Sequence, residues 1–173
     1  MIPREGQAEP AKSRARSFGK PAVLYEAGVR HLRAGAPLDA QLCCQQALAM
    51  DPHHADAMHL MGLITLHANR HDLAIEWISR AIKQEPKPEY LTSLGTTLLK
   101  QGRREEALKT FDKAVQLRPD SAELWKNLGD ALAKLERPDE ALLTYQHALK
   151  LDPHNSEAAA KRASLLSKLS RLK

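Results

Sequence analysis

The strongest constraint on the fold of this chain is an internal repeat of about 34 residues. Four sets of identical residues recur along the chain at intervals of 34, 33 and 34 residues. Such a fixed period indicates stacked supersecondary units, each too small to be stable alone, that bury a shared core and present an extended surface. The four sets are Gly28, Gly62, Gly95 and Gly129; Ala40, Ala74, Ala107 and Ala141; Ala47, Ala81, Ala114 and Ala148; and Pro52, Pro86, Pro119 and Pro153.

Each repeat is predicted to hold two helices joined by a short turn. A helix is expected to end near the fifteenth position, where Gly35, Asn69 and Gly102 suit the left-handed conformation that ends helices. The fourth repeat departs from this rule with Glu136, although Pro138 follows and suits the first turn of a second helix. The proline near the end of each repeat ends its second helix. The repeats are expected to span residues 21–54, 55–87, 88–121 and 122–155.

The two ends of the chain differ from the repeats in composition. Residues 1–20 carry a net charge of +3 without a periodic apolar pattern, so we expect a disordered basic tail. Residues 156–173 carry a net charge of +4 and are predicted to form a helix whose N-cap is Ser156. This helix is similar to the first helix of a further repeat, except that Arg162 stands where leucine is expected. Three roles stay open for it: a cap on the fourth repeat, a continuation into a longer chain, or a surface for weak self-association.

Charge and composition argue against several classes of function. The repeats themselves carry a net charge of −2, because the positive excess lies at the two ends, and this argues against binding of nucleic acid. No apolar run approaches the roughly 20 residues of a membrane-spanning helix, and the N-terminus lacks the apolar stretch of a secretion signal. We therefore expect a cytoplasmic protein without a membrane span. Its two cysteines are expected to stay reduced, with Cys44 in the core and Cys43 nearer to solvent.

No arrangement of residues in the sequence points to catalysis, a cofactor or a metal. Six of the eight histidines lie between His31 and His71. However, His59 and His67 stand about two turns apart on one predicted helix, too far to share an ion without further ligands. The sequence has no glycine-rich phosphate loop and no spacing typical of a catalytic triad. We expect no enzymatic activity, no cofactor and no metal site.

These repeats resemble the tetratricopeptide repeat, a helix–turn–helix unit of 34 residues. The resemblance covers about 135 of the 173 residues. It implies an all-α, right-handed superhelical solenoid followed by the C-terminal helix, in which the repeated residues have structural roles. It is most complete in the fourth repeat, where the residues in family positions are Trp125, Leu128, Gly129, Leu132, Ala141, Tyr145, Ala148 and Pro153.

The resemblance also implies a concave groove in which such proteins bind extended peptides. At about 100° per residue, positions 2, 5, 9, 12 and 13 of each first helix share one arc that would line this groove. Apolar side chains on an exposed inner face favour a bound peptide or helix. The alternative is that Leu63, Val29 and the leucines at the twelfth position belong to the core. The candidate partner-binding residues are Tyr25, Val29, Arg33, His59, Leu63, His67, Thr92, Thr96, Lys100, Lys126 and Asp130.

Two known binding patterns of the family do not match this groove. The lysines and asparagines of the clamp that grips a chaperone's C-terminal carboxylate are absent from the corresponding positions. An asparagine ladder resembling that of O-linked N-acetylglucosamine transferases has one rung of four, Asn127. The sequence therefore predicts a non-catalytic protein-interaction scaffold that binds a peptide or helix of a protein partner. The alternative is the N-terminal docking or targeting module of a larger enzyme, such as a glycosyltransferase fused to these repeats.

Overall fold

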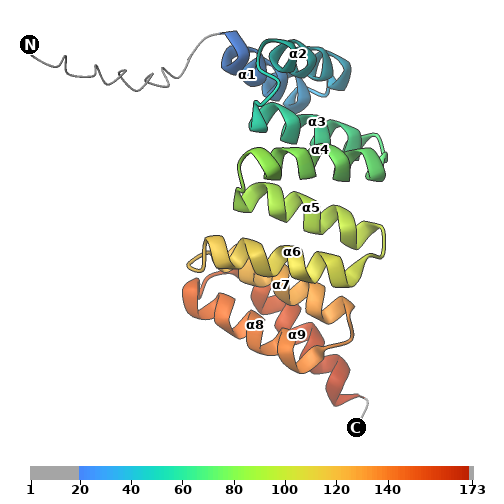
Figure 1. Ribbon diagram of the computed structural model, residues 1–173. Helices are drawn as coiled ribbons and strands as arrows, with labels where there is room; N and C mark the ends of the chain where they lie inside the picture. The colour runs from blue at the N-terminus through green and yellow to red at the C-terminus, as the bar shows by residue number, and fades with distance from the viewer. Residues whose placement is uncertain (1–19, 172–173) are drawn as a thin grey trace, which may run out of the picture.

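A computed structural model of the protein describes residues 20–171, which form a stack of nine helices (Figure 1). The predicted disorder of the tail falls on residues 1–19, which lie outside the described range, and α1 begins at Lys20, one residue before the expected first repeat. The helices are α1 (Lys20–Arg33), α2 (Pro37–Met50), α3 (Ala55–His67), α4 (His71–Gln84), α5 (Pro88–Lys100), α6 (Arg104–Leu117), α7 (Ala122–Lys134), α8 (Pro138–Leu151) and α9 (Ser156–Ser170).

The helices pack in chain order, and α1 and α9 lie at opposite ends of the stack (Figure 1). Each helix contacts the next one, and the odd-numbered helices also contact one another in the order α1, α3, α5, α7 and α9. Within the described range, no two even-numbered helices touch. The odd-numbered helices therefore form a continuous inner face, and the even-numbered helices spread apart on the outer face. The expected all-α solenoid with a C-terminal helix is confirmed.

The repeated glycines lie where the two helices of a repeat approach most closely. A β-carbon added to Gly62 would lie 2.5 Å from Ile78, and one added to Gly129 would lie 2.6 Å from the ring of Tyr145. Real β-carbons do not approach other atoms so closely, so a side chain at either position would push the helices apart. The buried alanines Ala74 and Ala141 keep the facing helix equally close.

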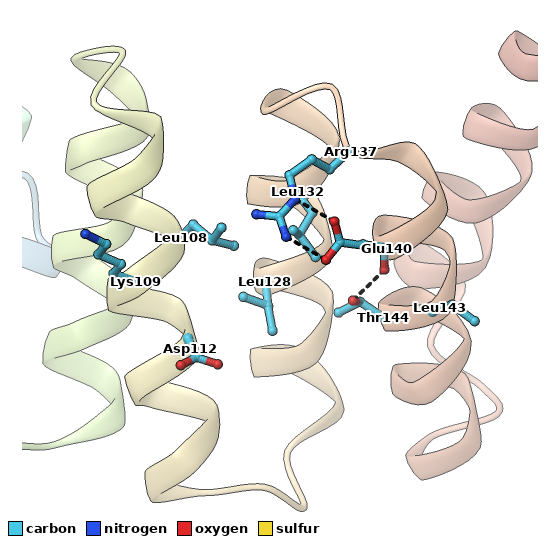
Figure 2. A pocket seen from close by; sticks show the side chains of 9 residues that line it. All are labelled: Leu108, Lys109, Asp112, Leu128, Leu132, Arg137, Glu140, Leu143 and Thr144. Carbon is cyan, nitrogen blue, oxygen red and sulfur yellow. Dashed lines mark hydrogen bonds and ion pairs between the residues drawn. The ribbon is translucent and has the colours of Figure 1, made fainter.

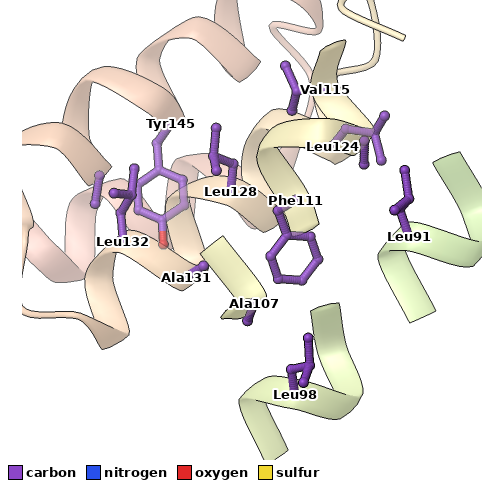
Figure 3. Packing of buried hydrophobic residues seen from close by; sticks show 12 residues of the cluster. Leu91, Leu98, Ala107, Phe111, Val115, Leu124, Leu128, Ala131, Leu132 and Tyr145 are labelled. Carbon is purple, nitrogen blue, oxygen red and sulfur yellow. The ribbon is translucent and has the colours of Figure 1, made fainter. Parts of the chain in front are cut away.

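Large apolar side chains fill the spaces between the helices. In the second half of the stack they form one cluster that extends from α5 to α8 around Phe111 and Tyr145 (Figure 3). In the first half there are two separate clusters, one around Cys44 in α2 and α3, and one around Ile78 from α3 to α5. Cys44 is fully buried and Cys43 is partly exposed, as the sequence predicts.

All four turns inside the repeats use the same hydrogen-bonded end. In the fourth repeat, the N–H of Arg137 donates to the carbonyl of Leu132, and the N–H of Glu136 donates to that of Ala133. This pattern, a Schellman motif, needs a left-handed residue at the fifteenth position. Glu136 adopts it with φ of 59°, close to Asn69 at 56°, so the expected departure at this turn does not occur. Pro138 opens α8, as predicted.

The start of α9 differs from the prediction by one residue. The N-cap is Asn155, whose side-chain oxygen accepts a hydrogen bond from the N–H of Ala158 at 2.9 Å. Ser156, the predicted cap, is instead the first residue of the helix. Asparagine and serine are similar as capping residues, so the sequence alone did not discriminate between these neighbours.

Candidate partner-binding surface

The inner face is lined by α1, α3, α5, α7 and α9, and it carries all eleven predicted partner-binding residues. Because the helices start at equivalent positions in the repeats, the same positions of successive helices form rows along this face. The side chains in these rows differ in how far they remain accessible, and four environments can be distinguished.

The apolar candidates near the start of the chain are partly buried in the core. Val29 and Leu63 are half-buried against the cluster around Cys44, as is Leu32. The ring of Tyr25 lies 5.7 Å from that of His54, and burial raises the pKa of the Tyr25 hydroxyl. Leu63 is therefore partly a core residue, which supports the alternative reading of this position.

A polar cluster joins α3 to α5 at the inner face. The Nε2 atom of His59 lies 2.9 Å from the hydroxyl of Ser93, which itself donates to the carbonyl of Glu89. Since the hydroxyl proton is used, the Ser93 oxygen accepts, and neutral His59 carries its proton on Nε2. Burial lowers the pKa of His59 to about 4, and its ring packs at 4.5 Å from that of Tyr90. His59 is thus a neutral structural contact between repeats.

Asp56 stands beside His59 and accepts two hydrogen bonds. The donors are Lys87, at 3.0 Å, and the hydroxyl of Tyr90. Burial opposes the charge on Asp56, but these two hydrogen bonds outweigh it and lower the pKa of Asp56. Burial and the bond to Asp56 raise the pKa of Tyr90. The carboxylate of Asp56 therefore links α3 to α5 through these two hydrogen bonds.

Lys126 is placed differently from the other predicted contacts. Only 5% of the residue is exposed, and its ammonium lies 2.7 Å from Glu123 and 2.8 Å from Glu157 of α9. Burial would lower the pKa of Lys126, but the two carboxylates raise it. Asp130, one turn later, accepts from the hydroxyl of Tyr145 at 2.6 Å and lies 3.5 Å from Lys161. Both residues fasten α9 to the fourth repeat and are less accessible than the sequence suggested.

The remaining candidates are open to solvent. Arg33, His67, Thr96 and Lys100 are exposed, whereas Thr92 is half-buried and donates its hydroxyl to the carbonyl of Pro88. In the described part of the chain, neither Arg33 nor Lys100 lies within 4.0 Å of a carboxylate. His67 donates from Nδ1 to the carbonyl of Leu63 at 2.8 Å.

Two clefts open on the inner side of the second half of the stack. The first, of about 350 Å³, lies between the starts of α5 and α7 and includes Thr92 and Asn127. The second, of about 240 Å³, lies between the ends of α7 and α9 and includes Asp130 and Lys134. These clefts place hollows on the inner side of the third and fourth repeats and α9.

Sequence reasoning missed a larger cleft on the outer face. It has a volume of about 450 Å³ and lies in the gap between α6 and α8, with α7 at its floor (Figure 2). Its walls carry Leu108 and Leu143, and its rim carries the ion pair between Arg137 and Glu140 at 2.6 Å. An equivalent cleft of about 330 Å³ lies between α4 and α6 beside Arg103 and Glu106. The repeated Arg and Glu, three residues apart, were the available signal.

In the described range 20–171, no three His, Cys, Asp or Glu side chains come together as they would around a metal ion. No helix of that range is long and apolar enough to cross a membrane. The outer and inner clefts are open hollows between helices, suited to contact with another macromolecule.

Comparison with known proteins identifies the family of the repeats. The family model described as tetratricopeptide repeat matches residues 25–88 and 92–156, which is most of the chain. Two curated relatives are both named Protein O-mannosyl-transferase TMTC1. The human protein is 36% identical over 72 residues, and the mouse protein is 30% identical over 98 residues. The match covers 42% and 54% of this chain, but only 8% and 10% of those relatives.

Several solved structures share the fold. PilF of Pseudomonas aeruginosa has a TM-score of 0.81 and 25% identity, with 88% of this chain and 70% of that chain covered. MamA of Desulfovibrio magneticus RS-1 has a TM-score of 0.77 and 20% identity, with 87% and 86% covered. YrrB, described as having an unusual peptide-binding site, has a TM-score of 0.71 and 20% identity, with 85% and 76% covered. At such low identities, the last two show the fold alone.

Proposed function

Because this chain belongs to the tetratricopeptide repeat family, we propose that it is a non-catalytic scaffold that binds a peptide or helix of a partner protein on its inner face. The observation that carries the proposal is the continuous inner face, on which exposed side chains such as Thr96 and Lys100 have no structural partner. YrrB, a protein of the same fold, has a peptide-binding site. In this chain, the clefts between α5 and α7 and between α7 and α9 offer places for the side chains of a bound peptide.

Site-specific photo-crosslinking tests this proposal. A photoreactive phenylalanine at Thr96 reports on the inner face, and the same residue at Lys113, exposed on α6, is the matched control on the outer face. After illumination in an extract of the native cells, a discrete adduct is expected from position 96 and not from position 113. Circular dichroism must show that both variants keep the helical content of the native protein. Adducts from position 113 alone, or from neither position, would contradict the proposal.

Thr96 is a better probe than Leu63 for this purpose. Leu63 packs against the cluster around Cys44, so a charged substitution there would disturb folding together with binding. Thr96 is exposed, and its replacement leaves the core unchanged.

A second candidate function follows from the curated relatives. Both are O-mannosyl-transferases, and this chain spans about a tenth of their length. The same inner face could then serve as the docking module of a larger enzyme. A reading frame that continues past Lys173 into a catalytic domain would support this function, and a stop codon at that point would argue against it.

Two further proposals concern the setting of the scaffold. We place it in the cytoplasm, which a fluorescent fusion to the full chain would test. Weak self-association through α9 is supported by Leu166 and Leu143, which are 44% and 68% exposed and line one hollow at the end of the stack. Sedimentation velocity at increasing concentration measures it, and a constant sedimentation coefficient of a monomer would exclude it.

A further inference from the structure

The last turn of every inner helix carries a basic residue at the same position of the repeat. All of these side chains are exposed, and they follow one another along one edge of the inner face. We call them the basic row: Arg33, His67, Lys100, Lys134 and Lys168.

The opposite edge of the inner face carries acidic side chains, and these already lie in ion pairs. Each acidic residue near the start of an inner helix has an ion-pair partner: Asp56 pairs with Lys87, Glu89 with Arg118, and Glu123 and Glu157 with Lys126. In the range 20–171, no ion pair within 4.0 Å involves a member of the basic row. The inner face therefore has one edge whose carboxylates are paired and one edge whose arginine and lysines have no carboxylate within 4.0 Å. The histidine of the row, His67, donates from Nδ1 to the carbonyl of Leu63 at 2.8 Å.

Stability of the single helices explains only part of this arrangement. A cation near a helix C-terminus interacts favourably with the helix dipole, which accounts for one basic residue in each last turn. It does not account for the cleft between α7 and α9, where Lys134, Lys161 and Lys168 meet around a single carboxylate. That carboxylate, Asp130, already accepts from Tyr145 and lies 3.5 Å from Lys161. The cleft thus has more positive charge than its own residues can balance.

We propose that the basic row binds an extended acidic segment of the partner protein, with one of its carboxylates seated in the cleft between α7 and α9. This inference rests on the proposed function, because it names the chemistry of the partner held on the same inner face. Neighbouring packed helices lie about 8–10 Å apart, and an extended chain in the polyproline II conformation brings every third side chain to the same face, about 9 Å apart. An acidic residue at every third position of the segment would therefore meet successive members of the row.

The neighbouring side chains favour a protein over a single-stranded nucleic acid. Proteins that bind single strands combine positive charge with aromatic side chains on which bases stack. The residues one turn before the basic row are not aromatic, and the ring of Tyr90 is only 2% exposed. These preceding residues are Val29, Leu63, Thr96, Asp130 and Ser164.

Fluorescence anisotropy with a labelled peptide of about 15 residues tests the inference. The peptide carries Asp at every third position between Ser and Gly, and a matched peptide carries Asn at the same positions. The acidic peptide is expected to bind the full chain and the Asn peptide is not. The affinity should fall as salt rises from about 50 to about 300 mM, because exposed charges are screened. Equal binding of the two peptides would overturn the inference.

Charge-reversal variants locate the contact on the row. The double variant Lys100→Glu/Lys134→Glu is expected to weaken binding of the acidic peptide by about tenfold or more. The control Lys113→Glu/Lys150→Glu makes the same change of charge at exposed positions of α6 and α8 and is expected to change affinity by less than about twofold. Both must keep the native helical content. An equal loss in the control, or tighter binding of an oligothymidine of equal charge, would contradict the inference.

The two proposals fail in different ways. If crosslinking from position 96 identifies a partner while the acidic peptide does not bind, the scaffold function stands and the acidic chemistry is wrong. If no adduct forms from position 96 and the acidic peptide binds equally to the row variant, both are wrong.

Discussion

The two halves of the solenoid bury their apolar side chains differently. From α5 to α8 one continuous cluster surrounds Phe111 and Tyr145, whereas α2 to α5 hold two smaller clusters around Cys44 and Ile78. These four residues occupy the same position of their repeats, and their size increases along the chain. The rings of Phe111 and Tyr145 belong to one cluster that runs through all four helices of two repeats. The thiol of Cys44 belongs to a smaller cluster formed by α2 and α3. Since the stability of a solenoid is close to a sum of local contributions, we expect the second half to be the more stable one.

The largest expected difference between the halves comes from truncating this central side chain. Tyr145 is 2% exposed and donates to Asp130, so Tyr145→Ala should lower the free energy of unfolding by about 3–5 kcal/mol. Cys44→Ala removes one buried sulfur atom and should cost about 1 kcal/mol. Urea denaturation followed by circular dichroism measures both values. Equal losses would refute the view that the side chain at this position contributes more to the core in the second half.

The second-largest difference in stability is expected from substituting the glycines that face these side chains. A β-carbon at Gly129 would lie 2.6 Å from the Tyr145 ring, so Gly129→Ala should destabilise by about 1–3 kcal/mol. At Gly28 the contacts would be 3.2 Å or longer, and the gain of about 1 kcal/mol in helix propensity should offset them. Thermal melting of the two variants compares them. A marked loss from Gly28→Ala would show that the first repeat is packed as tightly as the fourth.

Mild acid should act on the first half before the second. The folded state holds His59 neutral with a pKa of about 4, against about 6.5 unfolded, so the unfolded chain binds the proton more readily. Stability contributed by this group is complete above pH 6.5 and is lost as pH falls toward 4, by about 1 kcal/mol at pH 6. His59→Gln should remove this dependence when unfolding is measured at pH 7.5 and pH 6.

In the second half, the equivalent position holds a charge that does not titrate in this range. Lys126 stays protonated, and its hydrogen bond lowers the pKa of Glu157, so the pair keeps its charges at pH 6. Fluorescence of Trp77 and Trp125 reports on the two halves separately. Simultaneous loss of both signals at pH 6 would contradict a difference between them.

The smallest expected effect concerns the turns of the first and fourth repeats. Gly35 and Glu136 both have positive φ, at 75° and 59°, but only glycine adopts this region without steric cost. Glu136→Gly should stabilise the protein by about 0.5–1 kcal/mol, because relief of strain exceeds the added freedom of the unfolded chain. Gly35→Ala should destabilise it by a similar amount. Differential scanning calorimetry measures both, and a neutral Glu136→Gly would show that Glu136 makes compensating contacts.

The fold was predictable because its determinants repeat. Four equivalent glycines, two sets of four equivalent alanines and four equivalent prolines recur on one period, which predicts stacked helical repeats. Glutamate disfavours the left-handed region, so Glu136 was not expected there. The preference of a single residue is a weak constraint, and the two hydrogen bonds that close the turn outweigh it. Asn155 and Ser156 are neighbours, and both are good capping residues, so the sequence did not decide which of them caps α9.

The helices that carry the candidate residues were predictable, but the accessibility of these residues was not. The helical wheel placed all eleven residues on the inner helices. However, Lys126 is buried, and its ammonium donates to the carboxylate of Glu157, 31 residues later in the chain. His59 is similarly engaged by Ser93, 34 residues later. A search for partners one repeat away would have found both contacts. The outer clefts form where three helices meet, and the Arg and Glu repeated at the starts of α6 and α8 mark only their rims.

The absence of contact between even-numbered helices of the range 20–171 also has a mechanical consequence. The chain resembles a spring whose inner side is closely wound and whose outer side is open. Tension along its axis should widen the gap between α6 and α8 while the distance between α5 and α7 changes little. Such a spring would lengthen or twist without releasing a molecule held on its inner side, and the hollow beside Leu143 would change volume with the load.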